Sequence, residues 1–181
     1  MSTVIVTLIN DLKNKIDKEG REINGTKEVV GVVLPAIRVH ELVLEAEENA
    51  IRDYYYGKGI NTQAVRSLEH NLYEFIYRGL RQSVEQLLYF DKTQDFTSRR
   101  FVFSTTDCIA HVHLIYRNES ASLFAHIRST DVVKLLPWDL LFLCRLIKRV
   151  LNDSAFPHTK EMTVQVTIGS AHFYLKAAAM Y

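Results

Sequence analysis

The sequence predicts an α+β fold, in which a long helix and a core helix pack a mixed β-sheet. Three observations predict this class. Apolar residues recur every three or four positions from about residue 62 to residue 90, two alternating runs follow at 109–117 and 121–129, and a second helical pattern starts at residue 131. Spacings of three and four indicate helices, and alternation indicates strands. No internal repeat or low-complexity linker divides the 181 residues, so we expect one domain, residues 1–181.

The first predicted elements are a strand and the long helix. Residues 28–37 are rich in valine and are interrupted by Gly31 and Pro35, which predicts a strand with an irregular end. Residues 62–90 form an amphipathic helix, with a bend expected near Gly79. Its apolar face consists of Leu68, Leu72, Ile76, Leu80, Val84 and Leu87.

The two alternating runs predict a β-hairpin. A turn centred on Asn118 and Glu119 joins them and places His111 opposite His126. Successive side chains of a strand point to opposite faces. The first strand therefore divides into an apolar face with Ala110, Val112, Leu114 and Tyr116, and a second face with His111, His113 and Ile115.

A helix and a strand complete the predicted fold. The helical pattern from residue 131 contains Pro137, so we expect the helix proper to start near that proline. Three cations near its end, Arg145, Lys148 and Arg149, suit the helix dipole. Alternation then predicts a strand from Met162 to Ile168 that leads into Gly169.

Composition excludes several kinds of partner. A formal net charge of +1 argues against generic nucleic-acid binding, because neutralising many phosphates needs an excess of lysine and arginine. No uncharged run approaches the roughly 18 residues of a membrane span, and the N-terminus lacks the pattern of a secretory signal. We therefore expect a cytoplasmic protein with no direct nucleic-acid partner and no membrane partner.

The two cysteines have different surroundings. Two cysteines in 181 residues do not form a disulfide framework. Cys144 lies within an apolar helical run and is predicted to be a core residue. Cys108 opens a strand after a polar run, where its thiol would be accessible.

Cys108 also begins a series of spaced motifs. Arg128-Ser129-Thr130-Asp131 follows it twenty positions later, and Pro137-Trp138-Asp139 and Gly169-Ser170-Ala171-His172-Phe173-Tyr174 come after that. This order and spacing resembles the thymidylate synthase family, which includes the deoxycytidylate hydroxymethylases. In that family a catalytic cysteine precedes an Arg-Ser-x-Asp motif, a Pro-Phe-Asn element and a Gly-Asp-x-His-x-Tyr motif.

The resemblance implies a thymidylate synthase-like fold and a one-carbon transfer to C5 of a pyrimidine deoxynucleotide, dCMP or dUMP. It implies 5,10-methylenetetrahydrofolate as cofactor and a homodimer formed back to back through the sheet. A cysteine attacks C6 only as a thiolate, and Arg128 lies on the strand antiparallel to the one that Cys108 opens. The resemblance assigns catalysis to Cys108, Asp139 and Tyr56, and nucleotide binding to Arg99, Arg100, Arg128, Ser129, Asp131, His172 and Tyr174, with the arginine pair reaching the partner's nucleotide.

Several positions depart from the family pattern. Asp139 stands where synthases have asparagine, and a carboxylate suits the N4 amino group of cytosine; an acidic residue in the first turn of a helix is equally explained by the helix dipole. Ser170, Asp107 and Ile109 replace family residues that orient the site. The catalytic glutamate has four candidates, Glu41, Glu45, Glu47 and Glu48. Glu41, Glu45 and Glu48 fall at helical spacing, which favours a charged helix face instead.

The sequence ends at Tyr181, where family enzymes continue with strands and a tail that closes over the folate. An open site would favour a hydroxymethyl over a methyl product, or no reaction. A hydroxymethylated pyrimidine would suggest a phage, and the compartment would then be the host cytoplasm.

Two alternatives remain open. The chain can be a synthase-like protein that binds nucleotides without turnover. Alternatively, His111, His113 and His126 can converge on zinc or iron, although packing at a sheet or dimer interface explains three histidines more simply.

Overall fold

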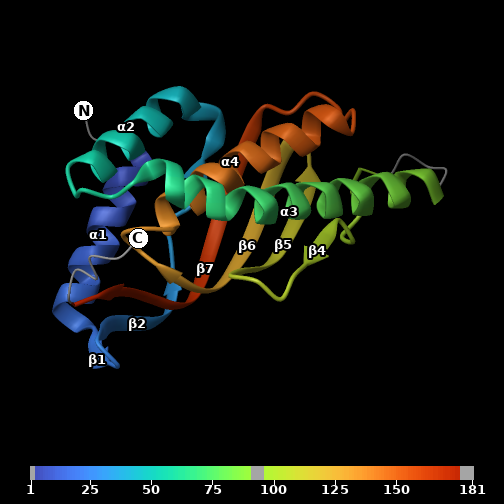
Figure 1. Cartoon of the computed structure of the whole chain (residues 1–181). Helices are drawn as coiled ribbons and strands as arrows, with labels where there is room; N and C mark the ends of the chain where they lie inside the picture. The colour runs from blue at the N-terminus through green and yellow to red at the C-terminus, as the bar shows by residue number, and fades with distance from the viewer. Residues whose placement is uncertain (1–2, 91–95, 176–181) are drawn as a thin grey trace.

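The computed structural model of the protein describes residues 3–90 and 96–175. These residues form a mixed, open seven-stranded sheet in the order β1-β2-β7-β6-β5-β4, with β3 also paired to β7, and helices pack against it (Figure 1). This arrangement is compatible with the predicted α+β class. The strands are β1 (Arg21–Ile23), β2 (Thr26–Val33), β3 (Ile37–Arg38), β4 (Val102–Ser104), β5 (Ile109–Arg117), β6 (Ser120–Asp131) and β7 (Glu161–Tyr174). The helices are α1 (Val4–Glu19), the 3-10 helix η1 (Val39–Glu41), α2 (Leu44–Tyr56), α3 (Thr62–Phe90) and α4 (Leu136–Asp153).

The hairpin β5–β6 has the predicted register. His111 lies opposite His126, and both turn residues, Asn118 and Glu119, have positive φ angles, as a tight two-residue hairpin turn requires. The predicted face assignment of Ala110 is wrong. The register shifts between Ile109 and His111, so that Ile109 is buried and Ala110 is only partly buried, because a bulge moves side chains to the other face.

The predicted strand 28–37 is two strands. β2 ends at Val33 and pairs there with Thr167, whereas β3 resumes at Ile37 opposite Val164. Pro35 lies between them and lacks the N–H that a continuous ladder needs. Both strands therefore lie along the same edge of β7.

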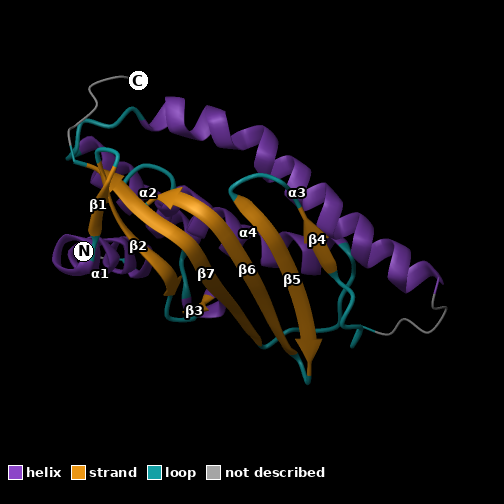
Figure 2. Ribbon diagram, turned by 90° about the horizontal axis from the view of Figure 1, so that it is seen from below, coloured by secondary structure: helices purple, strands orange, loops and turns teal. Residues whose placement is uncertain are grey.

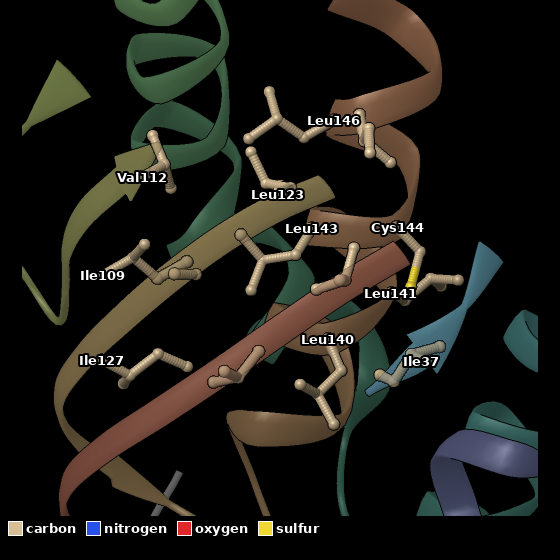
Figure 3. Packing of buried hydrophobic residues seen from close by; sticks show 14 of the residues in the cluster. Ile37, Ile109, Val112, Leu123, Ile127, Leu140, Leu141, Leu143, Cys144 and Leu146 are labelled. Atoms are coloured by element: carbon tan, nitrogen blue, oxygen red, sulfur yellow. The ribbon is translucent and has the colours of Figure 1, made fainter. Parts of the chain in front are cut away.

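Helix α4 crosses from the end of β6 to the start of β7, and these two strands pair in parallel. It begins at Leu136 with Pro137 in its first turn, which confirms the predicted start. Its leucines and Cys144 pack against apolar side chains of the sheet, among them Ile109, Leu123 and Ile127 (Figure 3). Cys144 is fully buried, as predicted.

Helix α3 has the predicted bounds and lies across the helical layer (Figure 1). Ile76, Leu80 and Val84 of the predicted apolar face are buried; the side chain of Leu68 lies outside the described residues. At Gly79, where we expected a bend, a Cβ atom would lie 2.1 Å from the ring of Phe103. This glycine therefore allows β4 to pack against the helix.

The sheet has one covered and one open face. Figure 2 shows the strands in front and the helices behind them. The open face carries exposed side chains on its central strands, namely Phe124, His126, Gln165 and Thr167. Within residues 3–90 and 96–175, no helix is both long enough and apolar enough to span a membrane.

Candidate active site

One end of the sheet gathers most of the predicted site residues. The arrowheads of β6 and β7 and the start of β5 lie at the same end of the sheet (Figure 2). There the Arg128 N–H donates to the Cys108 carbonyl oxygen at 2.7 Å. Ser129 pairs with Ser170. Strand pairing thus brings the thiol-bearing residue and the Arg-Ser motif together.

Asp131 forms the turn that leads from β6 into α4. Its carboxylate accepts the backbone N–H groups of Val133 and Lys134, both at 2.9 Å, and its carbonyl accepts that of Leu135. Asp131 is also paired with His172 of β7. Asp131 thus has a structural role, because its hydrogen bonds fix where α4 starts.

Asp139 lies in the first turn of α4 and is only 2% exposed. Its carboxyl accepts the Tyr73 hydroxyl at 3.0 Å and the Thr130 hydroxyl at 3.4 Å. Burial, and then the charge of Glu69, raise the pKa of Asp139 to about 8, although the two hydroxyl donors lower it. At neutral pH this carboxyl therefore carries a proton and can donate as well as accept a hydrogen bond.

Cys108 is half-buried beside these acids. Arg128 lowers the pKa of the thiol, as expected, but burial, Asp139 and Glu69 together raise it above the ordinary value. The pKa of Glu69 is itself raised, by burial and by Asp107. The thiol is thus held in its neutral form.

Glu69 and Tyr73 were not predicted as site residues. They lie one helical turn apart on α3, and Val65 and Ile76, on either side of them in sequence, are buried. A carboxylate within the buried stripe of an amphipathic helix is unusual, because an unpaired charge is costly to bury. That placement is the signal from which sequence reasoning could have found Glu69.

The four predicted candidates for a catalytic glutamate lie elsewhere. Glu47 accepts the backbone N–H groups of Val4 and Ile5 at the start of α1, both at 3.0 Å. Glu41 pairs with Arg38, and Glu45 is exposed. Glu48 is bound by three arginines, Arg52, Arg66 and Arg145.

Tyr56 faces solvent, whereas the preceding tyrosine enters the site region. The Tyr56 side chain is 88% exposed at the end of α2. Tyr55 is fully buried, its hydroxyl donates to the Lys134 carbonyl, and its ring centroid lies 6.1 Å from that of Trp138. Of these two tyrosines, Tyr55 contacts the segment that carries Asp139.

His172 and Tyr174 lie side by side at the end of β7. Their ring centroids are 5.9 Å apart in an edge-to-face arrangement, and the Lys134 ammonium lies 5.6 Å from the Tyr174 ring centroid. Ser170, which replaces the family's acidic residue, donates to Glu28 of β2 at 2.9 Å. A carboxylate is therefore present beside this position, supplied by a different strand.

Arg99 and Arg100 lie away from Cys108 in the same chain. The Arg99 carbonyl accepts from the His113 ring at 3.0 Å, and Val102 pairs with His113. At about 3.4 Å per strand residue, the arginine pair is on the order of 20 Å from Cys108 along the strand. The structure therefore does not bring the arginine pair together with Cys108 of the same chain.

The three histidines each bind a different neighbour. His111 contacts Ser104 at 2.9 Å, His126 contacts Thr167 at 2.9 Å, and His113 contacts the Arg99 carbonyl. Burial and the other two imidazoles lower the pKa of His111. No group of three or more His, Cys, Asp or Glu side chains within the described ranges is arranged to hold a metal ion.

Comparison with known proteins gives no assignment: no protein-family model matches the chain, and a search of curated proteins finds no match.

Proposed function

We propose that this chain has a thymidylate synthase-like fold and transfers a one-carbon unit to C5 of a pyrimidine deoxynucleoside monophosphate, dCMP or dUMP. The observation that carries the proposal is the convergence of Cys108, Arg128 and Asp139 at one end of the sheet. Strand pairing brings Arg128 to Cys108, and the turn held by Asp131 brings Asp139 to Thr130. A nucleophile, a cation and a hydrogen-bonding carboxyl are the groups that such a reaction needs.

In the proposed reaction, the Cys108 thiol loses its proton to Glu69 and the thiolate adds to C6 of the base. A raised pKa makes Glu69 a better base than an ordinary carboxylate. Arg128 and Ser129 hold the phosphate, and His172 and Tyr174 lie where the sugar would extend. Addition at C6 moves the electron pair of the C5–C6 double bond to C5, which bonds to the one-carbon unit as the bond of that unit to its donor breaks. The C5 proton then passes to water, the C5–C6 double bond forms again and the Cys108 thiolate leaves C6.

Asp139 reads the base in this proposal. A neutral carboxyl can donate to N3 of cytosine and accept from its N4 amino group, whereas an ionised one can only accept. Because Asp139 is almost fully buried, the residues that cover it must move when a base binds. We therefore expect dCMP to be preferred over dUMP, and Asp139→Asn to shift that preference toward dUMP.

The one-carbon donor is 5,10-methylenetetrahydrofolate, which supplies the methylene group when bound. Aromatic side chains next to Asp139 fit a planar donor: Trp138 packs near Tyr55, and its buried indole N–H has no hydrogen-bond partner in the part of the chain that the structure describes. Such an orphaned donor suits an acceptor on a ring. The proposed compartment is the cytoplasm, or the host cytoplasm for a phage protein.

The proposed partner is a second copy, joined through the open face of the sheet. That face carries the His111, His113 and His126 rings and Phe124, and Arg99 and Arg100 precede its edge strand β4 in the chain. A sheet face without a covering layer is a common interface. Sedimentation equilibrium should show a dimer, and Phe124→Asp should convert it to a monomer; a monomeric wild-type chain would remove the role proposed for the arginine pair.

The test of the reaction is tritium release from C5-labelled dCMP or dUMP, with and without methylenetetrahydrofolate, in wild type and Cys108→Ser. Release that depends on Cys108 supports addition at C6. A second candidate function is nucleotide binding without turnover, which is favoured by the raised pKa of the thiol. Calorimetric binding of either nucleotide without tritium release would establish that candidate and contradict the enzyme.

A further inference from the structure

A groove lies between α3 and α4, beside the candidate active site. It encloses about 170 Å³, is partly open to solvent, and has Tyr73, Glu74, Tyr77, Phe142, Arg145 and Arg149 in its lining. Tyr73 and Phe142 stack with ring centroids 4.0 Å apart, and the Arg149 guanidinium lies 3.5 Å from the Tyr77 ring centroid. The walls are thus aromatic rings and guanidinium planes, which stack well on planar groups.

The groove is also the centre of a positive cluster. Arg145 and Arg149 line it, and each belongs to a larger network. Arg145 shares Glu48 with Arg52 and Arg66, and Arg149 shares Glu74 with Arg78 and also binds Asp153. The Arg145 network has three arginines against one carboxylate, a net charge of +2, whereas the Arg149 network has two arginines against two carboxylates and is neutral. The groove lining itself has two guanidinium groups against the single carboxylate of Glu74. An anionic ligand group is therefore favoured at this position.

We propose that the groove between α3 and α4 is a second ligand site, for a small planar aromatic molecule that carries an anionic group. The ring would pack on the aromatic wall, and Arg145 and Arg149 would bind the anion. Space of this size holds one aromatic ring, and the open side of the groove leaves room for a second fused ring and the anionic group. This site does not depend on the proposed chemistry at Cys108.

The groove is connected to the candidate active site by one side chain. Tyr73 forms part of the groove wall, and its hydroxyl donates to Asp139 at 3.0 Å. A ligand that packs on the Tyr73 ring therefore contacts the residue whose hydroxyl bond lowers the pKa of Asp139. Occupancy of the groove would thus be coupled to the protonation of Asp139.

The first experiment is calorimetric titration of the full chain with three probes that share one ring system: 2-naphthoate, 2-naphthyl phosphate and 2-naphthylmethanol. We expect both anions to bind about tenfold more tightly than the alcohol, since a charge-assisted hydrogen bond contributes roughly 1.5–3 kcal/mol. The ratio of the two anions distinguishes a carboxylate ligand from a phosphate ligand. Equal binding of the alcohol, or no binding of either anion in the millimolar range, would overturn the proposal.

Substitutions of the groove arginines test whether the probes bind in the groove. Arg145→Gln and Arg149→Gln should each weaken binding of the anions about fivefold or more and leave the alcohol unchanged. The matched control is Arg78→Gln, because Arg78 shares Glu74 with Arg149 but is 79% exposed and does not line the groove. An equal loss in all three variants would contradict a site at the groove.

Two further measurements keep the test independent of folding defects and of the enzyme proposal. In the wild-type chain, added salt should weaken the anions but not the alcohol; a salt-independent affinity would contradict the role of the arginines. Cys108→Ser should bind all three probes like wild type, so that failure at Cys108 and failure at the groove give different results.

Discussion

Two regions of the helical layer, one around Glu48 and one around Asp139, shift the pKa values of their carboxyl groups in opposite directions. Glu48, whose side chain is 14% exposed, is bound by Arg52, Arg66 and Arg145, and the bonds to Arg145 and Arg52 hold its pKa below the usual value against the effect of burial. Asp139 has only hydroxyl partners, and burial and Glu69 raise its pKa to about 8. Similar side chains are thus charged in one region and neutral in the other.

The opposite pKa shifts distinguish a region whose carboxyl groups stabilise the fold from a region whose carboxyl groups suit proton transfer or ligand binding. Paired carboxylates such as Glu48 join helices, since they link α2, α3 and α4. Acids held near each other without cations, such as Asp139 and Glu69, cost stability and are concentrated where proton transfer or ligand recognition occurs. This contrast supports the placement of the candidate site around Cys108.

Removing the structural carboxylate should have the largest effect. Glu48→Ala leaves three guanidiniums without their shared partner, and we expect a loss of about 3 kcal/mol in the free energy of unfolding. Denaturant unfolding at neutral pH measures it. Glu45→Ala on the same helix is the control, because Glu45 is exposed, and it should change stability by less than about 0.5 kcal/mol. Equal losses in the two variants would show that the Glu48 network is not stabilising.

Asp139→Asn should raise the free energy of unfolding, whereas Glu48→Ala should lower it. The pKa of Asp139 rises from 3.8 to about 8 on folding, so the folded chain binds a proton that the unfolded chain releases between those pH values, and its contribution to stability falls as pH rises through that window. Below pH 4 the contribution is fully present, and above about pH 8 it is lost. The stability of the variant relative to wild type should therefore increase as pH rises from 4 to 8 and stay constant above that range. A pH-independent difference would mean that Asp139 is ionised throughout.

Tyr73→Phe should lower the free energy of unfolding by about 1 kcal/mol. The change removes the hydroxyl that donates to Asp139 and keeps the ring that stacks on Phe142, so the loss is that of one hydrogen bond to a buried group. Since this bond lowers the pKa of Asp139, the pKa should rise further in the variant. Unfolding measured across pH 5 to 9 gives both quantities, and an unchanged pH profile would show that the hydroxyl does not act on Asp139.

Thr130→Val should have the smallest effect, about 0.5 kcal/mol, because the Thr130 hydroxyl is 3.4 Å from Asp139 and its bond is the weaker of the two. The shape of the side chain is kept, so packing is unchanged. A loss larger than that of Tyr73→Phe would reverse the order of the two donors.

Elements with local patterns could be predicted from the sequence. The bounds of α3, the start of α4 near Pro137 and the pairing of His111 with His126 are confirmed, because helical spacing, a proline in a first turn and a two-residue turn each act over a few residues. The spacing of Cys108 and Arg128 likewise predicted that the two residues meet. Such features depend on one hairpin.

The remaining features depend on contacts between distant elements. Glu69 and Tyr73 join the site only because α3 crosses α4, and nothing near them in the sequence specifies that crossing. The bulge at Ala110 lies within the β5–β6 hairpin, but alternation alone does not show where a register shift occurs. Helix α1 was not predicted, although Ile5, Ile9, Leu12 and Ile16 recur at helical spacing. The 3-10 helix η1 has three residues, too few for a periodic pattern.

The parallel pairing of β6 with β7 has a consequence for how the molecule assembles. The hairpin β5–β6 closes through a two-residue turn, whereas β6 and β7 pair residues 41 positions apart and need α4 in place between them. Contacts that are distant along the chain form more slowly than local ones. During refolding, the thiol strand and the arginine strand should therefore meet early, and His172 should arrive beside Asp131 late. Ligand-binding capacity would then appear only with the slowest kinetic phase.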